Sequence, residues 1–146
     1  MSADPNVPLV TILYVEDNDD LRATIGELLH QPDRDIVLCA SAEQALDADR
    51  EHGFDIVVTD VSLPGMSGIE LARELLGADP KRRIVLCSGY ELGEHVLRLG
   101  PNMRAITKPF EIEDLETLMC ELSAAVRETE VERSGSPRLR TVTSLG

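Results

Sequence analysis

The chain has no tryptophan and, among its 146 residues, only two tyrosines and two phenylalanines. Hydrophobic residues still make up 42 %, mostly Leu, Val, Ile and Ala, so the sequence predicts an aliphatic core. Basic residues are also scarce, because 14 Lys and Arg stand against 27 Asp and Glu and give a net charge of −13. This excess argues against a general nucleic-acid or anionic-membrane surface and favours cationic partners or metal ions.

Long apolar runs and regular cysteine patterns are missing as well. No apolar run approaches the ~20 residues of a membrane span, and the start MSADPNVPL lacks the features of a secretion signal, so we expect a cytoplasmic protein. Cys39, Cys87 and Cys120 are odd in number and widely spaced, which indicates neither disulfides nor a zinc site. Their apolar surroundings favour buried thiols over a redox role.

Short apolar runs rich in β-branched residues alternate with amphipathic stretches along most of the chain. This rhythm, repeated five times, is typical of βα units around a parallel sheet and predicts an α/β fold. The apolar runs are continuous, as expected of strands covered on both faces. The predicted strands are residues 10–15, 36–40, 55–59, 84–87 and 103–106.

Helices are predicted between these strands. Two of them begin with the pattern of a capping box, Ser41 with Gln44 and Ser67 with Glu70, in which each side chain bonds a backbone donor of the other. The last helix carries an apolar stripe that we interpret as core, formed by Ile112, Leu115, Leu118, Met119, Leu122 and Val126.

The apolar pattern fades near Arg127, and the sequence after Thr129 is polar and without periodicity. We therefore expect a lead at residues 1–8, a domain at residues 9–127 and a flexible tail at residues 128–146. Three basic residues of the tail are either solvated charge or a contact with an acidic surface: Arg133, Arg138 and Arg140.

Polar side chains follow four of the five predicted strands. In an open parallel sheet, ligands bind beyond the carboxyl ends of the strands, so we expect these side chains to converge. They are Glu16 and Asp17 after the first strand, Asp60 after the third, Ser88 and Gly89 after the fourth, and Thr107, Lys108 and Pro109 after the fifth.

Three carboxylates at one place repel one another, by about 1–4 kcal/mol for each pair at a surface-like dielectric. A hard divalent cation would offset this repulsion, and Mg²⁺ is the abundant cytoplasmic candidate. A carboxylate beside Mg²⁺ and Lys108 can attack phosphorus, because both cations neutralise the transferring phosphoryl group. Asp60 is the candidate nucleophile, since it ends a central strand before the turn VSLPGMSG, and Ser88 offers a hydroxyl to a phosphoryl oxygen.

Each of these residues also has an ordinary structural explanation. Asp17 and the acidic residues after it suit a helix start through capping and the macrodipole alone. Asp60 could cap the next segment, Lys108 could be a strand-end charge, and Ser88 could belong to a turn. These explanations become improbable together, because the residues occur in order at successive strand ends.

The segments ILYVEDND, VVTDVSLPGMSGIEL, VLCSGY and ITKPF resemble the response regulator receiver family of two-component signalling in order and approximate spacing. The resemblance covers about residues 9–127. It implies a doubly wound, flavodoxin-like sheet of five parallel strands in the order 2-1-3-4-5, with five helices. It also implies a phosphorelay function, in which Asp60 accepts a phosphoryl group from a phosphohistidine with Mg²⁺ as cofactor. Such a protein catalyses only its own phosphorylation and dephosphorylation.

The resemblance further implies a role for each site residue. Asp17 and Asp60 are expected to bind Mg²⁺ directly, Glu16 mainly through metal-bound water, and Ser62 through its backbone carbonyl. The hydroxyl of Ser88 is expected to follow the phosphoryl group, and Lys108 to form an ion pair with it.

Two positions depart from the family's usual pattern. The acid pair is Glu16 and Asp17 where Asp-Asp is more common, which keeps the charge and should preserve metal binding. Ala105 stands where many receivers have a Tyr or Phe that rotates inward upon phosphorylation, so that aromatic switch cannot operate here. Tyr90, two residues after Ser88, either substitutes for it by reporting the position of Ser88 or packs at a helix start.

The residues after 127 cannot build a second core, so we expect output through binding. The phosphoryl group is expected to draw Ser88 and Lys108 inward and to switch a protein-binding face built by the fourth and fifth βα units. The expected partners are a histidine kinase or phosphotransfer protein and a downstream protein target, without nucleic-acid or membrane contact. A phosphate-sink role and a weak homodimer stay open, as does the choice between a stand-alone regulator and a hybrid-kinase receiver. The alternative functions are a non-phosphorylated pseudo-receiver and an aspartyl-phosphate phosphatase, although the first-strand DxD of the latter is missing.

Overall fold

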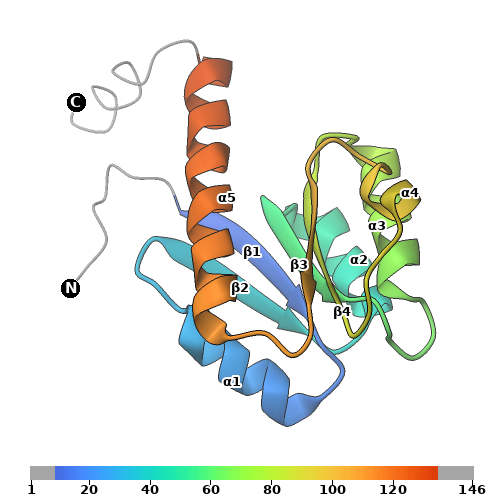
Figure 1. The fold of residues 1–146 in the computed structure, drawn as a ribbon. Coiled ribbons are helices and arrows are strands. Elements are labelled where there is room, and N and C mark those ends of the chain that lie inside the picture. Colours follow the sequence, from blue (N-terminus) through green and yellow to red (C-terminus); the bar gives the residue numbers. More distant parts are fainter. Residues whose placement is uncertain (1–8, 135–146) are drawn as a thin grey trace.

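The computed structural model describes residues 9–134, which form one parallel sheet with helices on both faces (Figure 1). The strand order is β2-β1-β3-β4-β5, and every neighbouring pair is parallel. The strands are β1 (Val10–Val15), β2 (Arg34–Cys39), β3 (Ile56–Asp60), β4 (Arg83–Ser88) and β5 (Met103–Thr107). The helices within the described range are α1 (Asp19–Leu29), α2 (Ala42–His52), α3 (Gly68–Ala78), α4 (Glu94–Leu97) and α5 (Ile112–Ser134). The predicted doubly wound α/β fold and its strand order are confirmed.

The helices divide into two groups, one on each face of the sheet (Figure 1). Helices α1 and α5 cover one face, where Ile25, Leu115 and Met119 pack against the sheet in one buried apolar cluster. Helices α2 and α3 cover the other face, where Leu71 and Leu75 belong to a second cluster. The stripe of the last helix is therefore core, as predicted, and β1 and β3 lie in the middle of the sheet with both faces covered.

The start of β2 differs from its prediction, because the strand begins at Arg34 rather than at residue 36. The Arg34 guanidinium is buried, and it donates to the carbonyl of Leu29 at 2.8 Å and to both carboxylate oxygens of Glu116 on α5 at 2.8 and 2.7 Å. A bidentate pair of this kind allows a charged residue to occupy a strand position that its residue type alone would not indicate.

The two predicted capping boxes have different outcomes. In α3 the box is complete, since Ser67 accepts from the Glu70 N–H and Glu70 accepts from the Ser67 N–H, each at 3.1 Å. In α2 only the serine half forms, because the Gln44 side chain accepts the N–H of Ala40 rather than that of Ser41. The predicted helix start is right, and the reciprocal bond is wrong.

Helix α5 bears on two expectations. It continues to Ser134, past the domain boundary predicted at residue 127, and in this part of the helix Arg127 donates to Asp33 at 2.7 Å and Thr129 accepts from Arg83 at 2.9 Å. Cys120 is exposed, whereas Cys39 and Cys87 are buried as predicted. It follows the inward-facing Met119 by one position, and consecutive residues of a helix point in different directions.

Three expectations concern parts of the chain outside the described structure. Residues 1–8 and 135–146, with Arg138 and Arg140, lie beyond the described residues, as does the side chain of Arg133. Among the helices described, none is long and apolar enough to span a membrane.

Candidate functional site

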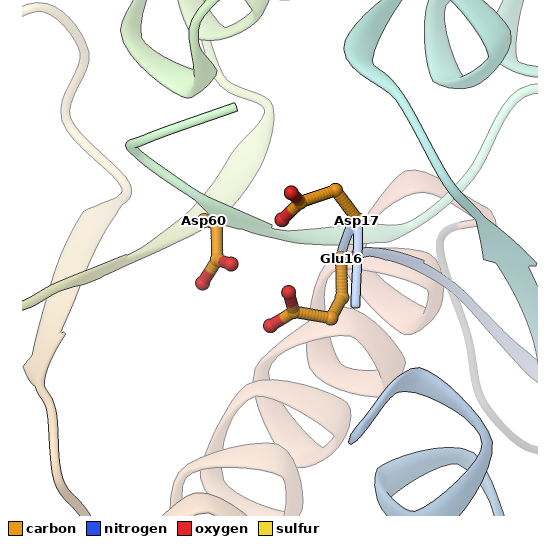
Figure 2. A group of neighbouring side chains, drawn as sticks. All are labelled: Glu16, Asp17 and Asp60. Carbon is orange, nitrogen blue, oxygen red and sulfur yellow. The ribbon is translucent and has the colours of Figure 1, made fainter. Parts of the chain in front are cut away.

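The carboxyl ends of β1 and β3 bring three acidic side chains together. Glu16, Asp17 and Asp60 each offer a carboxylate oxygen within 4.8 Å of the others. Figure 2 shows the three carboxylates around a shared space, with Asp17 and Glu16 approaching it from one strand end and Asp60 from the other. Asp17 is exposed, while Glu16 and Asp60 are buried, so the cluster has one side open to solvent.

Glu16 follows the last residue of β1 and is held in place through its backbone and its side chain. Its N–H donates to the Cys39 carbonyl at 3.0 Å, and its carbonyl accepts from Arg22 at 2.8 Å. One carboxylate oxygen, Oε2, accepts the N–H of Asn18 at 3.1 Å. Burial raises the pKa of the Glu16 carboxyl, and the neighbouring Asp60 carboxylate raises it further.

Asp60 ends β3, and its position is fixed by backbone packing. A Cβ atom at Gly68, the first residue of α3, would lie 2.0 Å from the Asp60 carbonyl oxygen, so only glycine permits this approach of α3 to the strand end. The Gly68 N–H also donates to the Val61 carbonyl at 2.9 Å, and the Val61 N–H donates to the Cys87 carbonyl on β4 at 2.9 Å. The loop after Asp60 is therefore anchored to the neighbouring strand and to α3.

Lys108, directly after β5, supplies the positive charge of the cluster. Its Nζ lies 2.5 Å from Asp60 Oδ1 and 3.5 Å from Glu16 Oε1. Partial burial lowers the pKa of Lys108, but the hydrogen bond and charge of Asp60 and the charge of Glu16 outweigh burial and raise this pKa overall. Lys108 is therefore a fixed cation at neutral pH.

Ser88, the last residue of β4, is buried, and its hydroxyl bonds to the backbone of the following loop. The hydroxyl donates to the Tyr90 carbonyl at 2.6 Å and accepts the Tyr90 N–H at 3.0 Å. Tyr90 is 52 % exposed and borders a surface pocket whose other lining residues include Ser62 and Pro64. The Ser88 hydroxyl thus links the end of β4 to the backbone of Tyr90, and both predicted roles of Tyr90 stay predictions.

Ser62 and Ala105 complete the predicted set, and both are exposed. Ser62 lies in the loop between β3 and α3, two residues after Asp60, where its backbone follows the anchored Val61. Ala105 lies on β5, paired in register with Leu86 of β4.

The donor set fits a Mg²⁺ ion. Glu16 Oε1 is buried and accepts no hydrogen bond from any residue of the described chain, so it can accept one from a metal-bound water. Asp17 and Asp60 offer further carboxylate oxygens to the same space, and oxygen ligands with retained waters are what Mg²⁺ prefers.

Sequence reasoning missed two residues near the site. The sequence indicated Gly68 only as part of a glycine-containing turn, although its lack of a side chain is what allows α3 to approach Asp60 so closely. Glu43 on α2 carried no signal, yet it accepts the N–H of Met66 in the loop after Asp60 at 3.0 Å. Neither contact leaves a pattern in the local sequence, unlike the polar residues at the strand ends.

Comparison with known proteins identifies related sequences over most of the chain. The family model of the response regulator receiver domain matches residues 12–119. The chain is 32 % identical over 120 residues to the transcriptional regulatory protein YkoG of Bacillus subtilis, in a match that covers 80 % of this chain and 51 % of YkoG. The chain thus spans about half the length of that relative.

A second relative and a solved structure match over more of their own length. The sporulation initiation phosphotransferase F of Bacillus subtilis is 29 % identical over 108 residues, which cover 71 % of this chain and 86 % of that protein. The BeF3-activated DrrB receiver domain superposes with a TM-score of 0.68 at 28 % identity, over 80 % of this chain and 98 % of that structure.

Proposed function

The chain belongs to the response regulator receiver domain family, and from this membership we propose that it accepts a phosphoryl group on Asp60 from a phosphohistidine of a partner protein. Receiver domains generally act as signalling modules in two-component and phosphorelay systems and bind Mg²⁺ at an acidic pocket. The observation that carries the proposal is the ion pair of Asp60 with Lys108 at 2.5 Å beside the carboxylates of Glu16 and Asp17.

Mg²⁺ would be held by the carboxylates of Asp17 and Asp60 and the backbone carbonyl of Ser62, with Glu16 acting through water. When bound, the ion neutralises charge on the equatorial oxygens of the transferring phosphoryl group. Similarity to a phosphotransferase and to a receiver solved in a BeF3-activated form supports this assignment.

The chain's own residues position and neutralise the reacting groups. A carboxylate oxygen of Asp60 forms the new bond to phosphorus while the bond from phosphorus to the donor histidine nitrogen breaks. The imidazole leaves with the electron pair and then takes up a proton. Lys108 stays beside the new acyl phosphate and pairs with one of its oxygens, since its Nζ already lies at Asp60 Oδ1.

The phosphorylated state would be read through Ser88 and Tyr90. The Ser88 hydroxyl has one proton, which bonds the Tyr90 carbonyl at 2.6 Å, so donating it to a phosphoryl oxygen would release that carbonyl. The exposed Tyr90 ring would then move with the loop, while Ala105 offers no aromatic ring to respond. NMR signals of the Tyr90 ring should shift when BeF₃⁻ binds, with the buried ring of Phe54, at the opposite end of β3, as reference. An unchanged Tyr90 would remove it from the switch.

The partners follow from this chemistry. Receiver domains interact with histidine kinases or phosphotransfer proteins, and we assign the same donors to this chain, together with a downstream protein target and a cytoplasmic location. The receiver unit comprises residues 9–127, with α5 continuing beyond it to Ser134.

Phosphoryl uptake can be tested directly. The protein is incubated with Mg²⁺ and a small acyl-phosphate donor, and its intact mass is measured over time. Wild type should gain one phosphoryl group, and Asp60→Asn should gain none. Asp47→Asn, which alters an exposed carboxylate on α2, serves as the control and should behave as wild type.

Two results would contradict the proposal. Absence of added mass on wild type would favour a pseudo-receiver that only binds partners. Multiple turnover of a phosphate ester, without a stoichiometric acyl phosphate, would favour a phosphatase.

A further inference from the structure

The loop between β3 and α3, residues 61–67, carries the Ser62 carbonyl and is fixed at both ends. At its start, the Val61 N–H donates to Cys87 on β4, and at its end Ser67 caps α3. Between these ends the chain reverses at Gly65, whose φ of +75° lies in the left-handed region. The side chains of Leu63 and Met66 pack against the apolar cluster on this face of the sheet, whereas Ser62, Pro64 and Gly65 are exposed, so the exposed turn depends on its hydrogen bonds.

A residue from another element contacts this turn. Glu43, in the first turn of α2, accepts the N–H of Met66 through Oε2 at 3.0 Å. The same oxygen covers Gly65 closely, because a Cβ atom built there would lie 2.7 Å from it. The bond joins residues 23 positions apart and connects α2 to the loop after Asp60, beside the packing of Leu63 and Met66 on the cluster that contains Ala42 and Ala45 of α2.

We propose that Glu43 is a positioning residue for the Mg²⁺ site, which acts through Met66 to hold the Ser62 carbonyl toward the ion. It does not touch the ion or the phosphoryl group. The inference rests on the proposed function and deepens it, because it adds to the site a residue from α2, an element that supplies none of the predicted ligands.

The geometry supports a hydrogen-bonding role rather than a charge effect. The Glu43 side chain is exposed, so solvent screens its charge, whereas the bond to Met66 has a fixed direction. Accepting this N–H lowers the pKa of Glu43, so the acceptor stays ionised at neutral pH. A glutamine side chain retains an acceptor oxygen at the same reach, and an alanine does not.

Three variants separate the contact from its charge. Glu43→Ala removes both, Glu43→Gln keeps the acceptor, and Asp47→Ala removes an exposed carboxylate one turn further along α2. The first readout is amide hydrogen exchange of Met66 in Mg²⁺-free protein. Glu43→Ala should exchange about tenfold faster than wild type, while the other two variants should stay within about twofold of it.

The second readout is the Mg²⁺ dissociation constant, measured by titrating backbone amide shifts of Ser62 and its neighbours. Glu43→Ala should weaken binding about fivefold, which corresponds to the net value of one hydrogen bond. Saturating Mg²⁺ should restore its rate of phosphoryl uptake, because the residue supports the ligand and not the chemistry. Glu43→Gln should bind Mg²⁺ nearly as wild type does.

The outcomes separate this role from the proposed function. If wild type binds Mg²⁺ and is phosphorylated, and Glu43→Ala does both equally well, the positioning role is refuted and the function stands. Faster Met66 exchange with unchanged Mg²⁺ affinity also refutes it, as does a Glu43→Gln variant that matches Glu43→Ala. Failure of wild type itself to bind Mg²⁺ or to take up a phosphoryl group refutes the function.

Discussion

Substitution of Gly68 by alanine should displace Asp60 and destabilise the fold. The added Cβ atom would lie 2.0 Å from the Asp60 carbonyl oxygen, 2.8 Å from its carbonyl carbon and 3.0 Å from the Val61 Cα. All three are backbone atoms, and those of Asp60 belong to a central strand that pairs with β4. No side chain can rotate away to relieve this overlap, so α3 or the strand end must move.

Overpacking of a well-packed interior costs about 1–3 kcal/mol and occasionally more. Because the overlap is with backbone on a central strand, we expect the upper end, a loss of about 3 kcal/mol in the free energy of unfolding. Gly77 is the matched control, since it lies on the same helix and a Cβ atom there would meet nothing within 4 Å. Gly77→Ala should raise the stability by about 0.5–1 kcal/mol through helix propensity.

Urea unfolding followed by circular dichroism measures both variants, and amide spectra report whether Asp60 and Val61 have moved. Because folded domains typically have a free energy of unfolding of ~5–15 kcal/mol, the Gly68→Ala variant should remain folded and can be measured. A loss below about 0.5 kcal/mol with unchanged Asp60 and Val61 amides would show that the close approach of α3 does not fix Asp60. A loss in Gly77→Ala equal to that in Gly68→Ala would attribute the effect to the helix instead.

Three further predictions concern charged residues. Lys108→Met removes the cation between two buried carboxylates, so the free energy of unfolding of the Mg²⁺-free protein should fall by about 1–2 kcal/mol. Added Mg²⁺ should stabilise this variant more than it stabilises wild type, as measured by thermal unfolding with and without the ion. Glu116→Gln should lose about 1–2 kcal/mol at neutral pH. Arg34 holds the Glu116 pKa below its ordinary 4.5, so the stabilisation by the Arg34–Glu116 pair is present above about pH 4.5 and disappears as the pH falls through the folded-state pKa of Glu116. A stability difference between wild type and Glu116→Gln that persists in acid would contradict this reasoning. Asp49→Asn breaks the buried ion pair with Arg82, whose two hydrogen bonds are 2.8 and 2.9 Å long. The free energy of unfolding in urea should fall by about 3 kcal/mol, and a loss under 1 kcal/mol would mean that water replaces the pair.

The strand ends could be predicted because their signals are local and the topology is regular. Parallel strands place their carboxyl ends at one edge of the sheet, so Asp60 and Lys108 meet although they are far apart in the sequence. An apolar run and the polar residue after it suffice to predict that edge. The charge of Arg34, by contrast, obscured the start of β2, because its partner Glu116 lies on α5.

Other features depend on contacts that no local pattern contains. The exposure of Cys120 follows from the rotation of α5 relative to the sheet, which an apolar neighbourhood in sequence does not specify. Gln44 bonds Ala40 because the chain entering α2 brings that N–H within reach. Ser88 was predicted as a strand-end hydroxyl, but the bond of that hydroxyl to the Tyr90 backbone depends on the path of the next loop.

The exposed alanine at position 105 affects whether the phosphoryl donor and a downstream target can bind the domain at the same time. In receivers with an aromatic residue at this position of β5, the resemblance implies that the ring rotates inward upon phosphorylation. A methyl group at Ala105 cannot rotate in this way, so under the proposed function the phosphorylated state is read through the loop from Ser88 to Tyr90, which follows β4 next to the strand that ends in Asp60. A target would then have to recognise the rim of the same site that a phosphohistidine donor must enter. Donor and target would exclude each other, and the signal would pass from one to the other only after the first has left.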